Sequence, residues 1–349
     1  MNGLGFAVGG RWVGDGAPCF VIAEAGANHN RDLEMARELI AVAAEAGADA
    51  VKFQTYSAET LYSKAAPRFT YLEGVTDKST WDLIKSIELP REWQPRLAEE
   101  ARARGIVFMS TPFDHRAVEE LDALGVPAFK IASFEIVDLP LVQRAAATGK
   151  PMIISTGLAD LEDIQDALAA CAAAGNQHVA LLQCASLYPA PPARVNLRAM
   201  ATMRQAFGVP TGLSDHTLGI HVPVAAAALG AAVIEKHYTL SRALPGPDHP
   251  FAIEPGELTA MVRQIREVEA ALGDGRKGAP QPDEVEMHQK ARRSLIAVRP
   301  IRRGTRIEAD MLTIKRPGFG IKPKHAVLVV GRVARVDIDE DAVLTWDML

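Results

Sequence analysis

Two histidines have the type and the spacing of metal ligands. His216 lies in the run TGLSDHT, and His237 lies in the next short apolar run, AAVIEKHYTL, on the same strand face as Glu235. If these runs are neighbouring strands, both imidazoles can reach one point. Imidazole with carboxylates and water suits Mn²⁺, Fe²⁺, Co²⁺ or Zn²⁺. Two protein ligands leave positions open for a substrate, so the pattern predicts a Lewis-acid site. The alternatives are that either histidine is a neutral hydrogen-bonded group or a general acid. Cys184 is a candidate third ligand but is expected to pack as a small hydrophobe.

A second set of candidates consists of lysines and hydroxyl groups at the ends of other short apolar runs. Charged and neutral donors together are what a phosphate with a nearby carboxylate requires. For any single hydroxyl, the alternative is that it caps the end of its strand. The set comprises Lys52, Thr111, Lys130, Ser133, Ser155 and Ser214.

Further polar residues occupy equivalent places. Glu24, Gln54, Glu135, Ser186 and Tyr188 also stand at or near the ends of apolar runs. Buried polar groups are costly without partners, so a purely structural protein would not repeat this arrangement. The pattern therefore predicts a functional site where the runs end.

The elements that must position these residues are short strands and amphipathic helices in strict alternation. This order implies a parallel sheet, and eight units over about 250 residues predict an α/β fold of the (β/α)₈ TIM-barrel class, with the site at the carboxyl ends of the strands. An open doubly wound sheet is the alternative. The expected strands lie within residues 19–26, 48–56, 106–113, 128–136, 151–158, 179–189, 211–217 and 231–240.

The chain is expected to have four parts. Residues 1–18 are expected to form an N-terminal hairpin that caps the barrel, and residues 19–273 are expected to form the barrel. Residues 274–288 are rich in Gly, Pro and charge and are expected to form a linker. Residues 289–349 are expected to form a small β-rich domain. Its core is marginal, so docking on a larger unit would add to its stability. The long connection from Ser57 to Pro90 is expected to form a wall or partial lid over the site.

Composition narrows the class of protein. The net charge of −5 argues against non-specific binding of nucleic acid, which needs a basic surface. No apolar stretch is long enough to span a membrane, and MNGLGFAVGG lacks the pattern of a signal peptide. Three cysteines are too few for a disulfide framework, which favours reduced thiols and a cytoplasmic protein.

Taken in order, several motifs resemble the sialic acid (N-acetylneuraminate) synthase family, which includes legionaminate and pseudaminate synthases. The resemblance runs from about Val21 to the end, and the last domain resembles the antifreeze-like (SAF, β-clip) module of that family. The motifs are EAGANHN, VKFQTY, STPFD, KIASFE, STG, SLYPAP, GLSDHT, IEKH, LPGPDHPFAIEP, RRSL and KRPGFGI.

The resemblance implies a C–C bond-forming transferase that condenses phosphoenolpyruvate with an N-acyl aminosugar and releases phosphate. It implies a divalent metal, Mn²⁺ or Mg²⁺ with Co²⁺ or Fe²⁺ as alternatives, at His216 and His237. Phosphoenolpyruvate is then expected at Lys52, Thr111, Lys130, Ser133, Ser155 and Ser214. The sugar is expected at Gln54, Glu135, Ser186, Tyr188, Asp248 and Arg316.

The same resemblance implies catalytic roles and a partner. Glu24, with Glu135 as competitor, is expected to orient or deprotonate the attacking water, beside Lys52 and the two histidines. Arg316 is expected to come from the SAF domain of a second chain, which implies a domain-swapped homodimer whose small domain reaches the active site of its partner.

The identity of the sugar stays open. Ser186 stands where some members that make N-acetylneuraminate have Asn, and Arg292 and Arg293 stand where some members have a more apolar run. N-acetylmannosamine is the first expectation, and a diacetamido-trideoxy hexose, which leads to legionaminic or pseudaminic acid, is the alternative.

Three rival functions make different demands on the sequence. Another phosphoenolpyruvate-dependent 3-deoxy-sugar-acid synthase, acting on a sugar phosphate, would need a second basic cluster, and none is evident beyond Arg316. A non-catalytic sugar sensor predicts loss of a strand-end His or Lys, and none is missing. A metal-dependent hydrolase would show an HxH pair on the first strand, which here ends in EAGANHN.

Overall fold

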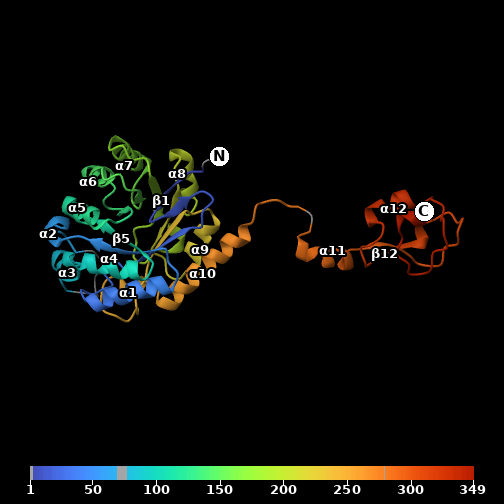
Figure 1. Ribbon diagram of the computed structural model, residues 1–349, viewed down its shortest axis with the longest axis horizontal. Helices are drawn as coiled ribbons and strands as arrows, with labels where there is room; N and C mark the ends of the chain where they lie inside the picture. Colours follow the sequence, from blue (N-terminus) through green and yellow to red (C-terminus); the bar gives the residue numbers. More distant parts are fainter. Residues whose placement is uncertain (1–2, 69–76, 279) are drawn as a thin grey trace. The chain divides into compact units, whose positions relative to one another are not determined.

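The structure is a computed structural model that describes residues 3–68, 77–278 and 280–349. The chain divides into two compact units, Met1–Gly273 and Asp274–Leu349 (Figure 1).

The first unit is a nearly closed barrel of eight parallel strands. In the sheet order β5-β4-β3-β10-β9-β8-β7-β6, the first barrel strand pairs in parallel with the last. The end strands of this order, β5 and β6, are neighbours in space, but no register of hydrogen bonds between them is found in the described residues. The predicted (β/α)₈ class is confirmed and the open sheet is excluded. The strands are β3 Phe20–Glu24, β4 Ala50–Thr55, β5 Val107–Pro112, β6 Phe129–Ile131, β7 Met152–Ser155, β8 Val179–Cys184, β9 Thr211–Asp215 and β10 Val233–His237.

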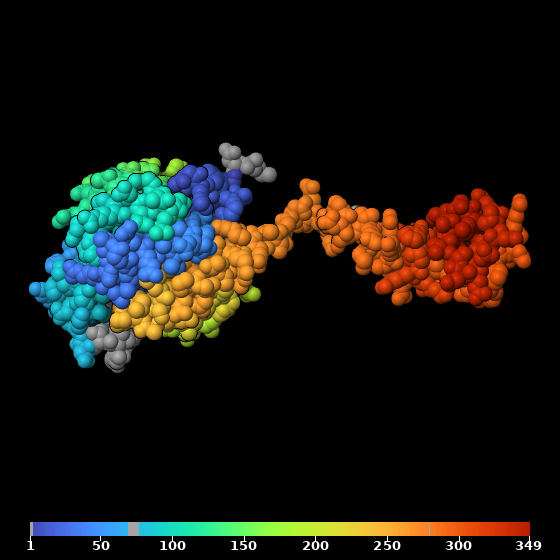
Figure 2. All heavy atoms as spheres, turned by 60° about the horizontal axis from the view of Figure 1, so that its bottom comes forward, coloured from blue at the N-terminus to red at the C-terminus, as the bar shows by residue number. Residues whose placement is uncertain are grey.

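Helices surround this sheet. Several begin at an aspartate whose carboxylate accepts backbone N–H groups of the first turn, as Asp32, Asp114 and Asp160 do. The first and last large helices lie side by side, so the outer ring also closes (Figure 2). They are α1 Leu33–Glu45, α4 Gln94–Ala103, α5 His115–Leu124, α6 Leu139–Ala146, α7 Leu161–Ala173, α8 Ala199–Phe207, α9 His221–Ala228 and α10 Pro255–Leu272, with α2 Ala58–Leu61 and α3 Thr80–Ile87 in the connection after β4 and 3₁₀ turns at Arg91–Trp93, Pro192–Arg194 and His249–Phe251.

The amino end of the barrel is closed by a hairpin. Strands β1 Gly5–Val8 and β2 Arg11–Gly14 pair in antiparallel fashion. Their buried side chains Phe6, Val8 and Val13 belong to the same apolar cluster as residues of the barrel strands, including Phe20 and Ile22. A larger cluster fills the space between strands and helices. Because this end is packed with apolar side chains, space for a ligand remains at the opposite end.

The second unit has its own small core. Strands β11 Ser294–Ala297 and β12 Leu312–Lys315 pair in antiparallel fashion, and a cluster of aliphatic residues packs around them. Helix α11 Val285–Ala291 spans the predicted boundary at residue 288 between the linker and the small domain. The unit also contains α12 Ala326–Val329 and 3₁₀ turns at Pro282–Glu284, Ala309–Met311, Pro323–His325 and Trp346–Met348.

In the described part of the chain, every helix is too short or too polar to cross a membrane.

Candidate active site

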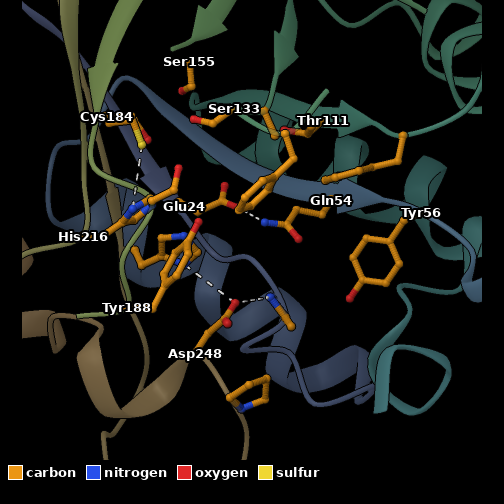
Figure 3. Close-up of a pocket in the computed structure, with 18 of the residues that line it drawn as sticks. Glu24, Gln54, Tyr56, Thr111, Ser133, Ser155, Cys184, Tyr188, His216 and Asp248 are labelled. Carbon is orange, nitrogen blue, oxygen red and sulfur yellow. Dashed lines mark hydrogen bonds and ion pairs between the residues drawn. The ribbon is translucent and has the colours of Figure 1, made fainter. Parts of the chain in front are cut away.

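A cavity of about 700 Å³ opens at the carboxyl ends of the barrel strands (Figure 3). It brings together nearly all of the barrel residues predicted from the sequence. Glu135 is not among the residues that line it, and Arg316 belongs to the second unit. The predicted residues that line the cavity are Glu24, Lys52, Gln54, Thr111, Lys130, Ser133, Ser155, Ser186, Tyr188, Ser214, His216, His237 and Asp248.

Two buried lysines stand at the base of the cavity. Lys52 Nζ lies 2.7 Å from Glu24 Oε2 and donates to Thr111 Oγ1 at 2.9 Å. Lys130 Nζ donates to Ser155 Oγ at 2.6 Å. Burial lowers the pKa of Lys130, although nearby carboxylates oppose this shift. The lysines and hydroxyls predicted as an anion site are therefore hydrogen-bonded neighbours.

Glu235 links the two lysines, and sequence reasoning gave it no role. Its Oε2 lies 3.8 Å from Lys52 Nζ, and its Oε1 lies 3.6 Å from Lys130 Nζ and accepts from Ser214 Oγ at 3.2 Å. With Glu24 it balances the charge of the two buried lysines. Its place on the same strand face as His237 was evident from the sequence, but the two lysines that it meets were not.

The two histidines meet as predicted from neighbouring strands. Their ring centroids are 5.4 Å apart, and Tyr188 lies 4.2 Å from the ring of His216. A carbonyl oxygen only accepts, so the contact of 2.9 Å from His216 Nδ1 to Ala185 O places a proton on Nδ1. In the neutral form of this ring Nε2 carries the electron pair that a metal needs, and burial, which lowers the pKa of His216, is outweighed by Cys184 and the Ala185 carbonyl, which raise it. Burial holds the pKa of His237 well below its usual value, and protonation of the neighbouring His216 would lower it further, so the His237 ring is neutral.

This donor set fits a divalent metal in part. A neutral imidazole anchored through one nitrogen is the usual form of a histidine ligand, and buried His237 Nδ1 has no hydrogen-bond partner in the described chain. Asp248 Oδ2 lies 3.8 Å from that atom. Among the described residues no group of three or more His, Cys, Asp or Glu side chains is arranged to hold a metal. A metal here would need ligands from substrate and water as well.

Two serine hydroxyls lie close to Gly157. A Cβ on Gly157 would lie 2.3 Å from Ser186 Oγ and 2.8 Å from Ser133 Oγ, so no larger residue fits in STG. Gly157 N–H donates to Ser133 Oγ at 3.0 Å, and the Ser133 side chain is also a hydrogen-bond partner of the Cys184 thiol. Ser186 Oγ is buried and has no protein partner in the described residues. The Ser186 hydroxyl is thus available to a ligand.

Glu24 and Glu135 differ in what surrounds them. Glu24 Oε1 accepts from Gln54 Nε2 at 2.8 Å inside the cavity. Burial raises the pKa of Glu24 to about 7, and Lys52 opposes that shift. Burial also raises the pKa of Glu135 to about 7, but this residue lies in the turn after β6. The strand was expected to extend to residue 136 and ends at Ile131, so the alternation of faces stops before Glu135.

Asp248 is held over the histidines by loop contacts. Its Oδ2 accepts from Ala27 N at 3.3 Å, and a Cβ on Gly26 would come within 2.8 Å of that oxygen. The next residue, His249, is braced by Thr239 Oγ1 at 2.6 Å and Asn30 Oδ1 at 3.2 Å. The loop after β10 therefore carries Asp248 into the cavity.

The connection after β4 forms one wall, as predicted. Its described residues contribute Leu61 and Tyr62 at the end of α2, and Leu83, Ile84 and Ile87 from α3. Residues 69–76 of this connection lie outside the described residues.

Comparison with known proteins agrees with the resemblance in the motifs. The chain is 41% identical to the N,N'-diacetyllegionaminic acid synthase of Legionella pneumophila, over 96% of this chain and 95% of that one. It is 36% identical to human N-acetylneuraminate-9-phosphate synthase, over 97% and 95%. A crystal structure of the N-acetylneuraminic acid synthetase of Leptospira borgpetersenii covers 82% of this chain and 95% of its own, with 35% identity and a TM-score of 0.74.

The family assignment follows from these matches. Residues 292–349 match the SAF domain, as expected for the small second unit. Residues 39–277 match the NeuB family, and together with the full-length relatives this shows that the chain belongs to the NeuB family.

Proposed function

We propose that this protein condenses phosphoenolpyruvate with the open-chain form of an N-acyl aminosugar and water to give a nonulosonate and phosphate. The observation that carries the proposal is one cavity in which a buried pair of lysines, with their hydroxyl neighbours, lies beside a pair of histidines.

Phosphoenolpyruvate is proposed to bind at the lysines. Lys52 and Lys130, with Thr111 and Ser155, supply charge-assisted and neutral donors for its phosphate and carboxylate. The lysines are already balanced by Glu24 and Glu235. Binding therefore exchanges part of an internal ion-pair cluster for contacts with the substrate.

The sugar is proposed to meet the histidine side of the cavity. Gln54, Ser186, Tyr188 and Asp248 would position it there. A divalent metal held by His216 and His237, Mn²⁺ or Mg²⁺ in the first place and Co²⁺ or Fe²⁺ otherwise, would polarise the aldehyde as a Lewis acid. The CH₂ carbon of the phosphoenolpyruvate double bond forms the new C–C bond to the aldehyde carbon. Positive character then builds at its neighbour, the carbon that carries the phosphate ester.

Glu24 is proposed to handle the water. Water adds to that electron-poor carbon, and breaking of the bond to the ester oxygen then releases phosphate and leaves a ketone. A carboxylate whose pKa is about 7 can take up a proton near neutral pH. Glu24 is favoured over Glu135 because only Glu24 lines the cavity.

A homodimer is also proposed, in which Arg316 from the SAF domain of one chain contacts the sugar bound by the other. Arg316 is exposed and forms none of the ion pairs found in the described residues. Arg316→Ala should raise the KM for the sugar and leave the KM for phosphoenolpyruvate unchanged. An unchanged KM for the sugar would contradict this contact. A cytoplasmic location stays a prediction from the sequence.

The test of the proposed reaction is direct. The purified protein is incubated with Mn²⁺, phosphoenolpyruvate and a panel of N-acyl aminosugars, and both released phosphate and 2-keto acid are measured. The proposal predicts equal amounts of the two products with at least one sugar. Absence of turnover with every N-acyl mannosamine and every diacetamido-trideoxy sugar would contradict it.

A further inference from the structure

A buried ion pair lies next to the two histidine positions, outside the cavity. Lys236 Nζ lies 2.5 Å from Asp215 Oδ2, and the two side chains are 1% and 0% exposed. Asp215 immediately precedes His216 in the chain, and Lys236 immediately precedes His237. Because successive side chains of a strand point to opposite faces, the pair faces the helix layer while the histidines line the cavity.

The register of the sheet brings this pair together. Asp215 and Lys236 stand directly opposite each other in the parallel pairing of β9 with β10. They follow the opposed residues Ser214 and Glu235, which line the cavity. The ion pair therefore links the two strands at the last residue before each histidine.

Lys236 also holds the turn that carries His216. Besides its contact with Asp215, the ammonium group of Lys236 donates to the backbone carbonyl oxygen of Thr217. The Asp215 carboxylate in turn accepts from Thr217 Oγ1 at 2.9 Å and from Thr217 N at 3.2 Å. The residues on both sides of His216 are thus bound to one side chain of β10, the strand that carries His237.

Such a pair contributes more to geometry than to stability. The cost of removing two charges from water offsets most of the attraction between them, so apolar side chains of similar size would stabilise the fold as well. Groups that hold a metal ligand from behind, by contrast, set its position, and their loss weakens metal binding. The separation of the His216 and His237 rings, 5.4 Å between centroids, depends on how the two strand ends are held together.

We infer, on the basis of the proposed metal site, that Lys236 and Asp215 are positioning residues whose ion pair holds the two histidines at the separation that binds one divalent cation. Neither residue touches the metal or a substrate, since both face away from the cavity. Each acts through the histidine that follows it in the chain.

The test separates position from stability. Mn²⁺ is titrated calorimetrically into the metal-free protein, and the thermal unfolding midpoint is measured in parallel. Lys236→Met or Asp215→Asn alone leaves one buried charge without its partner and should lower the midpoint by about 10 °C. The double variant Asp215→Asn/Lys236→Met removes both charges and should recover most of that loss. Its affinity for Mn²⁺ should still be weaker than that of wild type by about tenfold or more, because the side-chain link between the two strand ends is gone.

The matched control is Asp49→Asn/Arg266→Met. Arg266 Nη2 lies 2.8 Å from Asp49 Oδ2 at the amino end of the barrel, and neither residue lines the cavity. The affinity of this variant for Mn²⁺ should equal that of wild type, whatever its unfolding midpoint.

A milder pair of variants keeps the test decisive if the double variant does not fold. Thr217→Val loses the hydroxyl from which Asp215 accepts, and Thr217→Ser keeps it. The first should weaken Mn²⁺ binding by about threefold, and the second should bind as wild type does. Equal affinities in these two variants would overturn the inference.

The outcomes also distinguish this inference from the function on which it rests. Wild-type affinity in the folded double variant, or an equal loss in the control, would overturn the positioning role and leave the proposed condensation intact. Absence of Mn²⁺ binding in the wild-type protein would overturn the metal assignment of the proposed function, and the inference with it.

Discussion

The two ends of the barrel both carry charged clusters, and they differ in how completely the clusters are paired. At the amino end, Asp49 accepts from Val21 N at 2.7 Å, lies 2.8 Å from Arg266 Nη2 and forms an ion pair with Arg11. Arg266 also donates to Cys19 O at 2.7 Å. At the carboxyl end, buried polar atoms of Ser186, Glu235 and His237 have no hydrogen-bond partner in the described residues.

This difference distinguishes polar groups that stabilise the fold from polar groups that bind a ligand. A paired cluster ties the hairpin, two strands and α10 together, and nothing in it is left for a ligand. An unpaired buried group has a cost of about 1–3 kcal/mol, which a substrate can relieve. The comparison therefore places chemistry at the carboxyl end and stability at the amino end, as is usual for this fold.

The largest expected effect is on catalysis at the carboxyl end. His237→Ala should lower kcat by about 10³-fold or more, because it removes one of the two groups proposed to hold the metal. The thermal unfolding transition should persist, since the ring has no hydrogen-bond partner at Nδ1 to lose. Activity assays with added Mn²⁺ and thermal unfolding scans measure the two effects. Full metal-dependent turnover in this variant would remove the metal assignment.

A change at the amino end should lower the stability of the protein and leave catalysis unchanged. Asp49→Ala leaves the buried N–H of Val21 without its acceptor and breaks two ion pairs. We expect the free energy of unfolding to fall by about 3 kcal/mol, measured by denaturant titration. The kcat of the folded variant should not change. A specific loss of kcat without loss of stability would break the division between the two ends.

A smaller effect is expected from pH. The folded-state pKa of Glu135 is about 7, raised by burial above its ordinary value of 4.5. The folded protein therefore keeps this proton when the unfolded chain has lost it, and the stability that Glu135 contributes decreases as pH rises from about 4.5 to 7. Over that window the difference in unfolding free energy between wild type and Glu135→Gln should shift by about 2 kcal/mol. A difference that is constant with pH would contradict this.

The sequence predicted the fold and the end of the barrel at which polar residues gather. Both follow from local signals, because alternating strands and helices imply the parallel barrel and strand ends imply the site. The pairings within the site were not predictable in the same way. Glu235 balances Lys52 and Lys130, which come from two other strands, so its role depends on the register of the whole sheet.

Glu135 shows the same limit. Glu135 was placed among the polar residues at the end of the fourth barrel strand, and the family resemblance implied its roles toward the sugar and the water, yet the chain turns after Ile131 and Glu135 does not line the cavity. The close contact of Ser133, Ser186 and Gly157 likewise joins three different loops. Such contacts depend on side chains that meet across the barrel mouth, which no local pattern encodes.

Phosphoenolpyruvate is proposed to bind at the buried lysine pair of the carboxyl end, Lys52 and Lys130, and not at the paired cluster of the amino end. The most direct measurement is a calorimetric titration of phosphoenolpyruvate, with Mn²⁺ present, into wild type, Lys130→Met and Asp49→Ala. Binding to Lys130→Met should be weaker by about 100-fold, because a buried charge partner is lost, while Asp49→Ala should bind as wild type does. Unchanged affinity in Lys130→Met, or an equal loss in Asp49→Ala, would contradict the account.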